Sequence, residues 1–375
     1  MEFRDLKAQY HYYKSEIDSA IQNVLLKGEF IGGQEVAELE AQLAEYVGVK
    51  HCISCANGTE AMTLVMMAWG IKKGDAVFVP DFTFFSTGEI VSLVGATPIF
   101  VDVDRETFNI DTEELEKAIQ KTMLAGKLTP KAIIPVDLYG LPANFPKIEN
   151  IAQKYGLLVL EDGAQGFGGG IKGKKACSFG DVATTSFFPA KPLGCYGDGG
   201  AIFTNDDNLA QLIKSLKVHG KGNDKYDNVR MGVNSRLDTI QAAVLKVKLK
   251  ALVSHELEDV NRIYRLYNER LRGLVETPLI PAGYYSSFAQ YTIKLNNNEQ
   301  RDGLQTTLRE NGIPSMIYYV KPMHRQTAFA YLEFDENDFE VSNELCKIVL
   351  SLPMHPYLSE ENIDVVCDVI KAYIV

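Results

Sequence analysis

The feature that most constrains this chain is a regular alternation of short apolar runs with amphipathic segments between residues 51 and 161. The short runs predict strands at 51–54, 76–80, 97–103, 131–136 and 157–161. The segments between them predict helices at 59–70, 86–94, 112–125 and 146–155. Strands that alternate with helices indicate a mostly parallel β-sheet with helices on both faces. Such a sheet binds its ligands at the carboxyl ends of its strands, so we expect the functional site at that edge.

The segments on either side of this region are mainly helical. Apolar residues at helical spacing predict helices at 14–28 and 34–47, joined by the glycine-rich turn 28–33. Further on, the pattern predicts helices at 206–217, 236–272, 300–311 and 359–373, and a strand at 289–295. We therefore predict a large domain over residues 1–250 and a smaller C-terminal α/β domain over residues 251–375, linked by the long helix.

Composition and charge argue against several classes of partner. The chain has 375 residues and a formal net charge of −11, so no basic surface is expected that could neutralise a nucleic-acid backbone. The apolar runs are of strand length, far short of the roughly 20 residues that cross a bilayer. The first residues are mixed in charge and lack the apolar core of a signal peptide. We expect no nucleic-acid partner, no membrane span and a cytoplasmic protein.

The cysteines do not predict a metal site. Cys52 and Cys55 form the only C-x-x-C pair among the six cysteines. A zinc or redox role would need a second ligand pair or a thioredoxin-like context, and neither is visible. The pair is therefore interpreted as two semi-buried thiols, and no metal is predicted.

Two residues, Asp162 and Lys191, are the candidates for chemistry. Asp162 directly follows the strand 157–161, at the edge where ligands bind. Lys191 lies between an aromatic stretch and a glycine-rich turn, where burial would lower its pKa and free the amine to attack an aldehyde. Alone, the aspartate could be a helix cap and the lysine a surface charge. Their occurrence together favours a Schiff-base lysine.

Pyridoxal 5′-phosphate (PLP) needs residues of both kinds. Its protonated ring is an electron sink, and an anion such as Asp162 keeps the ring nitrogen protonated. Its phosphate needs hydrogen-bond donors. The segment Asn57-Gly-Thr-Glu-Ala61 supplies a glycine turn and a hydroxyl ahead of a helix, whose free N–H groups favour an anion. Ser186 offers a second hydroxyl. We therefore predict PLP bound through Lys191.

These segments resemble, in their order and in their amino-acid sequence, the DegT/StrS family of PLP-dependent nucleotide-sugar aminotransferases. The matching stretches are 54–61, 82–87, 161–165, 186–191, 197–200 and 234–238. The resemblance implies fold type I, the aspartate-aminotransferase-like fold. It also implies that Gly58, Thr59 and Ser186 hold the cofactor phosphate. Phe84 would stack on the cofactor ring and Asp162 would pair with its nitrogen.

The same resemblance implies a homodimer with shared active sites. Gln165 would lie near the phenolate side of the ring, and Asn234 would reach the cofactor phosphate of the neighbouring subunit. The chain departs from the family's usual sequence at residues 137–140, where Asp137 replaces a histidine, and at residues 318–320. Neither departure touches the residues implied to hold PLP. No catalytic role is carried over to Asp137.

The sequences of segments 191–200, 234–238 and 351–357 are most similar to those of members that aminate carbon 3 of a nucleotide sugar. That subgroup converts UDP-2-acetamido-3-keto-glucuronate with glutamate, for bacterial surface polysaccharides. Arg236 would suit a carboxylate of the sugar or of glutamate through bidentate hydrogen bonds. Tyr319 and His324 are weaker candidates for substrate binding. His219 and His355 lie in loop-like surroundings and are left unassigned.

Three other functions compete with this interpretation. A 4-keto sugar aminotransferase of the same family would differ in the carbon that receives the amine. A PLP-dependent sugar dehydratase of this family would carry histidine in place of Lys191. A non-catalytic regulator would be expected to lose Lys191 or Asp162, and the chain keeps both.

Overall fold

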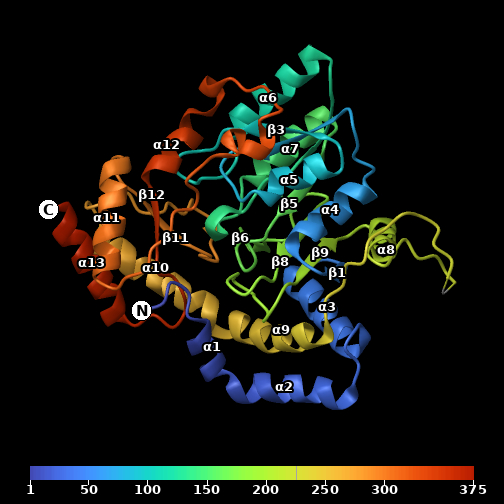
Figure 1. Ribbon diagram of the computed structural model, residues 1–375, viewed down its shortest axis with the longest axis horizontal. Coiled ribbons are helices and arrows are strands. Elements are labelled where there is room, and N and C mark those ends of the chain that lie inside the picture. Colours follow the sequence, from blue (N-terminus) through green and yellow to red (C-terminus); the bar gives the residue numbers. More distant parts are fainter. Residues whose placement is uncertain (225) are drawn as a thin grey trace.

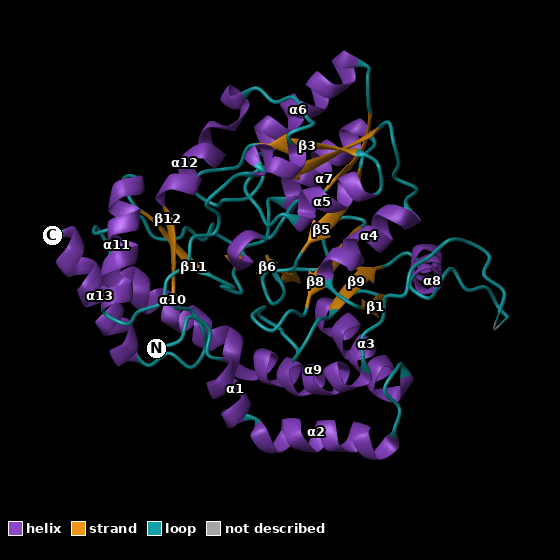
Figure 2. Cartoon of the chain, viewed as in Figure 1, coloured by secondary structure: helices purple, strands orange, loops and turns teal. Residues whose placement is uncertain are grey.

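A seven-stranded sheet forms the centre of the computed structural model, which describes residues 1–224 and 226–375 (Figures 1 and 2). Across the sheet the strands are β1 (His51–Cys55), β9 (Gly200–Thr204), β8 (Val182–Ser186), β5 (Leu158–Asp162), β4 (Thr129–Ile133), β2 (Asp75–Pro80) and β3 (Thr97–Val101). All neighbours pair in parallel except β9, which is antiparallel to both β1 and β8. The predicted mostly parallel sheet is confirmed.

The antiparallel strand β9 has a local cause. It follows β8 through residues 187–199, which contain no helix. A parallel return needs a crossover that passes back along the sheet, usually through a helix, whereas a direct loop brings the chain back antiparallel. The sequence patterns did not predict β8 or β9. The consequence is that the loop carrying Lys191 lies at the carboxyl end of β8.

Helices cover both faces of this sheet, as predicted. One face packs against α4 (Gly58–Ala68), α5 (Ser86–Leu93) and α8 (Asp207–Leu216). The other face packs against α3 (Gly33–Val47), α6 (Thr112–Ala125), α7 (Phe145–Tyr155) and α9 (Thr239–Ala251). Alternation along β2 shows why both faces are apolar: Val77 and Val79 enter the first core, while Phe78 enters the second.

Local signals fix where the helices begin and end. The Asp111 side chain accepts hydrogen bonds from the N–H groups of Glu113 and Glu114 and so caps α6. Gly126 ends the same helix in the left-handed conformation, with φ of 64°. α7 ends in the same way at Gly156. These caps explain why the predicted ranges 112–125 and 146–155 lie within one residue of the observed helices.

The C-terminal part forms a smaller α/β unit. Its two-stranded sheet pairs β11 (Tyr291–Lys294) antiparallel with β12 (Val349–Leu352). Around it lie α10 (Leu257–Leu271), α11 (Asn298–Glu310), α12 (Glu340–Ile348) and α13 (Glu360–Ile374) (Figure 1). A short second sheet, made of β10 (Tyr284–Tyr285), β6 (Gly170–Ile171) and β7 (Lys174–Lys175), connects this unit to the larger one.

The predicted helix 236–272 is shorter at its start and is not regular. Residues 234–238 are not helical, and Asn234 and Asp238 form isolated bridges to Val218 and Ile31. A π-helical turn, Leu252–Glu256, separates α9 from α10. The predicted domain boundary at residue 250 falls one residue before α9 ends. At the N-terminus, α1 (Leu6–Tyr12) leads into α2 (Lys14–Lys27), which packs along α9 (Figure 1).

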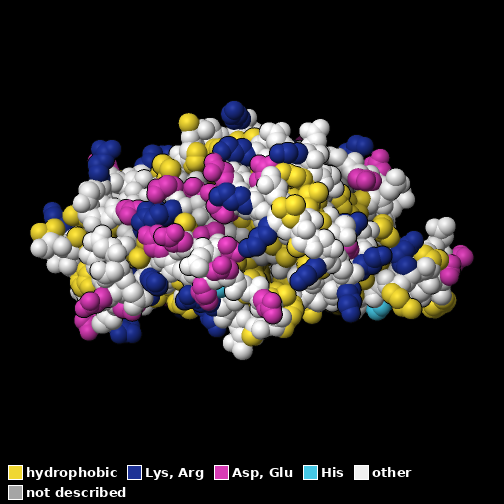
Figure 3. Space-filling model, turned by 90° about the horizontal axis from the view of Figure 1, so that it is seen from above, with side chains coloured by type: hydrophobic (Ala, Val, Ile, Leu, Met, Phe, Trp, Pro, Cys, Tyr) yellow, Lys and Arg dark blue, Asp and Glu magenta, His cyan; other side chains and the backbone are white. Residues whose placement is uncertain are grey.

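Further observations concern membrane-spanning helices, metal ligands, the cysteines and the surface charges. In the part of the chain that is described, no helix is both long and apolar enough to span a bilayer. Among the same residues, no cluster of histidine, cysteine and carboxylate side chains could hold a metal ion. Cys52 and Cys55 are buried free thiols. On the face shown in Figure 3, acidic and basic side chains are interspersed.

Candidate active site

Lys191 lies in the loop between β8 and β9, which is tightly folded. The Lys191 N–H donates to the Phe188 carbonyl at 2.8 Å, and the Cys195 N–H donates to the Phe187 carbonyl at 2.8 Å. A Cβ atom at Gly194 would lie 2.4 Å from the Pro189 carbonyl oxygen, so only glycine fits there. The glycine turn that marked this segment in the sequence therefore closes the loop that holds Lys191.

Asp162 ends β5 and is buried beside this loop. It pairs in register with Thr184 of β8. Its carboxylate accepts hydrogen bonds from the Thr87 hydroxyl at 3.0 Å and from the Ala164 N–H at 3.2 Å. Burial raises the pKa of Asp162, while these hydrogen bonds and the positive charge of Lys191 favour the ionised form. The structure thus brings the two predicted residues into one electrostatic unit.

The surroundings of Lys191 lower its pKa. Burial is the main cause, the negative charge of Asp162 opposes it, and the nearby positive charge of Arg4 adds to it. A lowered pKa raises the fraction of neutral amine, which is the nucleophilic form. This is the property that the sequence analysis expected from a lysine placed next to aromatic residues.

A cradle for an anion lies beside Lys191, at the start of α4. The Asn57 side chain caps this helix by accepting the Glu60 N–H at 2.8 Å. The N–H groups of Gly58 and Thr59 come too early in the helix to find a carbonyl partner within it. Ser186 closes the cradle from β8, because a Cβ atom at Gly58 would lie only 2.8 Å from the Ser186 Cβ. Phosphate fits such a site.

Three further predicted residues also meet at this edge. The Gln165 side chain is buried, accepts the Tyr139 N–H at 2.8 Å and donates to the Tyr319 hydroxyl at 3.3 Å. The Tyr319 ring lies 6.5 Å from that of Phe84, measured between centroids. Phe84 is 54% exposed, although it is a large apolar side chain. An exposed aromatic face near Asp162 is available for stacking on a flat ligand.

Asn234 and Arg236 do not join the site of their own chain. Both are exposed, whereas Ser235 between them is buried and its hydroxyl accepts the Ala56 N–H at 3.1 Å. This contact ties the segment to the loop ahead of Gly58. Because side chains alternate along an extended segment, Asn234 and Arg236 then point away from the protein.

The structure places His324 in a packed interior. Its side chain is 1% exposed. Nδ1 lies 2.7 Å from an Asp81 oxygen, Nε2 lies 3.4 Å from a Glu336 oxygen, and the ring stacks on Phe339 with centroids 4.3 Å apart. Both ring nitrogens are therefore used within the protein, and this arrangement gives no support to the predicted contact with substrate. Of the other two histidines, His219 is exposed and His355 is buried.

Sequence reasoning missed two features of the site. One is Thr87, which donates to Asp162, and the other is a pair of buried carboxyl groups, Glu161 and Asp137. The buried oxygens of Glu161 accept the N–H groups of Cys177 at 2.5 Å and Phe179 at 2.7 Å. The buried Asp137 accepts the Ala143 N–H at 3.1 Å through one oxygen, and its other oxygen accepts no hydrogen bond from residues 1–224 or 226–375. No spacing rule in the sequence joins these residues, because only the parallel pairing of strands brings them together.

One proton is expected to stay on this carboxyl pair. Burial and the negative charge of Glu161 raise the pKa of Asp137 well above its usual range. Glu161 receives two backbone N–H groups and is the better carboxylate of the two. The free oxygen of Asp137 then carries the proton toward Glu161. This pair lies directly behind Asp162, whose carbonyl oxygen accepts the Asp137 N–H at 3.0 Å.

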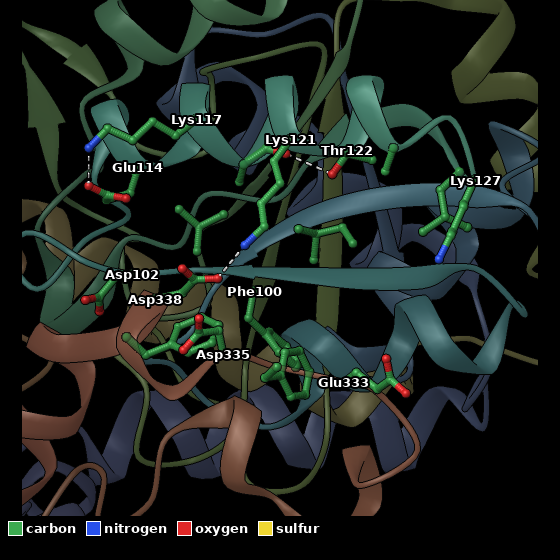
Figure 4. A pocket seen from close by; sticks show the side chains of 17 residues that line it. Phe100, Asp102, Glu114, Lys117, Lys121, Thr122, Lys127, Glu333, Asp335 and Asp338 are labelled. Carbon is green, nitrogen blue, oxygen red and sulfur yellow. Dashed lines mark hydrogen bonds and ion pairs between the residues drawn. The ribbon is translucent and has the colours of Figure 1, made fainter.

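A separate groove of about 540 Å³ lies between β3, α6 and residues 333–339. Figure 4 shows Lys121 reaching from α6 across this groove to Asp338, with which it pairs at 2.7 Å. None of the predicted site residues lines this groove. The chemistry suggested by Lys191 and Asp162 is therefore located elsewhere, at the carboxyl edge of the large sheet.

Comparisons with known proteins show to which family the chain belongs. The profile of the DegT/DnrJ/EryC1/StrS aminotransferase family matches residues 11–371. UDP-2-acetamido-2-deoxy-3-oxo-D-glucuronate aminotransferase of Pseudomonas aeruginosa is 47% identical over 371 residues, which cover 98% of each chain. A DegT/DnrJ/EryC1/StrS aminotransferase from Brucella abortus superimposes with a TM-score of 0.97, at 52% identity, over 100% of this chain and 99% of the other.

A third similar structure, DesV of S. venezuelae, holds a ketimine intermediate. It superimposes with a TM-score of 0.93 at 33% identity, over 99% of this chain and 98% of the other. The fold and the site define an aminotransferase. The chain belongs to the DegT/DnrJ/EryC1/StrS aminotransferase family. The predicted family and the aspartate-aminotransferase-like α/β fold are thereby confirmed.

Exchange of Asp137 for asparagine tests the proton assigned to the buried pair. Asp137 holds its proton more tightly when folded than when unfolded, so unfolding releases a proton above the unfolded pKa of about 4. Stability then falls as pH rises, by up to about 1.4 kcal/mol per pH unit from this group. In Asp137→Asn the amide still donates to Glu161 and has no proton to lose. The variant should show a flatter fall of unfolding free energy between about pH 5 and pH 8, measured by urea denaturation.

Asp368→Asn is the matched control, because Asp368 is exposed on α13. It should keep the pH dependence of the wild type. If Asp137→Asn lowers stability equally at every pH and leaves the slope unchanged, the proton does not lie on Asp137.

Proposed function

We propose that this protein is a PLP-dependent aminotransferase that transfers the amino group of glutamate to a keto carbon of a nucleotide-linked sugar in the cytoplasm. The observation that carries the proposal is the pairing of Lys191 with the buried Asp162 beside an anion cradle at one edge of the sheet. The donors and charges there match the needs of PLP: an amine for its aldehyde, a carboxylate for its ring nitrogen and N–H groups for its phosphate.

Each residue then has a defined task. Gly58, Thr59 and Ser186 hold the phosphate, and Phe84 covers one face of the ring. Asp162 holds a proton on the ring nitrogen, because a carboxylate kept in a buried site favours a charged partner. Gln165, fixed by two hydrogen bonds, orients the phenolate side of the ring.

When bound, PLP supplies a ring that draws electrons away from the carbon attached to the substrate nitrogen. The Lys191 amine, once released by the incoming amino group, is the base that takes a proton from the glutamate α-carbon. Lys191 Nζ would then carry that proton and give it up again within the same half-reaction, so that the amine is neutral for the next one. The keto sugar is aminated by the same residue working in the opposite order. The loop's hydrogen bonds at Phe187 and Phe188 keep Lys191 in place for both steps.

For the sugar, we propose a 3-keto nucleotide sugar such as UDP-2-acetamido-3-keto-glucuronate, for bacterial surface polysaccharide synthesis. Support comes from the P. aeruginosa relative, whose substrate is a 3-oxo-glucuronate linked to UDP and which matches the chain almost from end to end. Arg236, and to a lesser degree Tyr319, would contact this substrate.

We further propose that the active enzyme is a homodimer with shared sites. Asn234 and Arg236 are exposed, which leaves their side chains free to enter the site of a second copy. Large apolar side chains that are exposed on the surface also support a buried interface. They are Phe30, Ile31, Phe84, Phe188, Met231 and Val320.

Replacement of Lys191 tests the cofactor assignment. The wild type, loaded with PLP, should be yellow, and borohydride should fix the cofactor to the peptide that contains Lys191, as measured by mass spectrometry. Lys191→Ala should lose turnover by about 10³-fold or more, because both proton transfers and the covalent link depend on this amine. Lys250→Ala, at an exposed lysine of α9, is the control and should keep full activity. Retained turnover in Lys191→Ala would refute the assignment.

The position of the new amine tests the substrate proposal. We expect 3-keto UDP-sugars to be aminated with glutamate, and the product to carry its nitrogen at carbon 3 in two-dimensional NMR spectra. Parallel assays with 4-keto nucleotide sugars serve as the comparison. Faster amination of a 4-keto sugar would replace this proposal with the alternative assignment within the family.

Mixing two inactive variants tests the shared site. Lys191→Ala and Asn234→Ala should each have low activity as pure proteins. After they are unfolded together and refolded, roughly half of the dimers contain one chain of each kind, and each of these has one intact site. Activity should therefore recover to roughly a quarter of the wild type. Absence of recovery, with mixed dimers verified by mass spectrometry, would mean that Asn234 serves its own chain.

A further inference from the structure

The segment ahead of α1 places an arginine against the loop that carries Lys191. Arg4 Nη2 donates to the Lys191 carbonyl oxygen at 3.0 Å. The neighbouring Phe3 is fixed to the C-terminal unit, because its carbonyl oxygen accepts the Met354 N–H at 3.2 Å. Its ring also meets that of Tyr318 edge-on, with centroids 6.2 Å apart. Arg4 is therefore held where the two units of the structure meet, next to the reacting lysine.

The Tyr318 contact places Arg4 close to the predicted substrate region. Tyr318 is followed by Tyr319, which bonds Gln165 and faces Phe84. The Tyr139 hydroxyl donates to the Tyr318 carbonyl and so anchors this segment to the large sheet. The N-terminal segment thus contacts both the Lys191 loop and the segment of Tyr318 and Tyr319, which are proposed to serve the cofactor and the sugar.

The guanidinium of Arg4 has no ionic partner. No ion pair joins it to a carboxylate of residues 1–224 or 226–375. Glu256 attracts it from a longer distance, and the oxygens of Glu256 are already bonded by Gln9 at 3.2 and 3.4 Å and by the Tyr357 hydroxyl. Among the residues that the structure describes, the Arg4 side chain forms one hydrogen bond, whereas guanidinium offers five N–H donors.

Other cationic side chains lie near Arg4. Burial lowers the pKa of Arg4, and the charge of Arg4 helps to lower the pKa of Lys191 and of Lys248. The Lys248 ammonium is buried and donates to the Gly194 carbonyl at 2.5 Å. A protein with net charge −11 therefore keeps a locally positive site next to Lys191. Unpaired cations removed from water are costly unless an anion arrives to pair with them.

We propose that Arg4 is a specificity-determining residue that binds a carboxylate of the substrate reacting at Lys191. The inference rests on the proposed aminotransferase function and deepens it, because it predicts an acidic substrate. The free N–H groups of the guanidinium match a carboxylate in a bidentate arrangement. Two substrates of the proposed reaction carry this group: the sugar acid and glutamate. Arg236 of a second copy would then be available for the other one.

Binding measurements with unreactive ligands test this role without turnover. The cofactor-loaded wild type and the variant Arg4→Gln are titrated by calorimetry with UDP-glucuronate, UDP-glucose and glutarate. We expect Arg4→Gln to weaken UDP-glucuronate or glutarate by about 10- to 100-fold, the range of a charge-assisted hydrogen-bond pair, and to leave UDP-glucose unchanged. Loss of UDP-glucuronate alone identifies the sugar acid as the ligand, and loss of glutarate alone identifies glutamate.

Two controls separate this role from support of the loop. Arg309→Gln, at an exposed arginine of α11, should bind all three ligands as the wild type does. Arg4→Lys keeps the charge and should restore part of the lost affinity, and it serves as the test variant if Arg4→Gln does not fold. The thermal midpoint and the yellow absorbance band are recorded for each variant.

The proposal is overturned if Arg4→Gln weakens all three ligands equally, since Arg4 would then only hold the Lys191 loop. It is also overturned if none of the three is weakened. Failure of the proposed function has a different signature, because the wild type itself would then neither bind PLP through Lys191 nor transfer an amino group.

Discussion

The structure depends on one electrostatic constraint, the placement of the buried Asp162 and the half-buried Lys191 at the same edge of the sheet. Removing a carboxylate or an ammonium from water costs several kcal/mol per ion unless partners replace the solvent. Asp162 gains the Thr87 hydroxyl and the Ala164 N–H, and each of the two charges favours the ionised form of the other. The pairing of β5 with β8 supplies the rigidity that keeps the two residues together.

Close backbone approach is the second condition that the fold meets. A Cβ atom at Gly58 would meet Ser186 at 2.8 Å, and one at Gly200 would meet the Asn57 carbonyl at 2.5 Å. These glycines let the start of α4 lie against β8 and β9, so that the helix N-terminus lies next to Ser186. The anion cradle and the Lys191 loop are thus consequences of the same tight packing.

Two ionisable side chains near the site, Asp137 and Arg4, differ in how the protein compensates their charge. The buried Asp137 fits next to Gly166, at which a Cβ atom would lie 2.2 Å from the Asp137 carboxyl oxygen. Burial and the negative charge of Glu161 raise the pKa of this carboxyl, so it is expected to hold a proton. Arg4, in contrast, donates to the Lys191 carbonyl oxygen but forms no ion pair with a carboxylate in the described part of the chain. A buried group that is satisfied internally supports structure, whereas one left unpaired is suited to bind a ligand.

The sequence by itself determined the alternating α/β order, most helix ranges and the residues of the anion cradle. These depend on local rules: periodicity, caps such as Asp111, and glycine turns. It also singled out Asp162 and Lys191, whereas Gln165 and Phe84 were implied only by the resemblance to the family. Only the tertiary structure decided that β9 runs antiparallel, that His324 is enclosed by Asp81 and Glu336, and that Arg4 reaches Lys191 from 187 residues away. The physical reason is that such contacts depend on strand pairing and packing between distant segments, for which the chain carries no local signal.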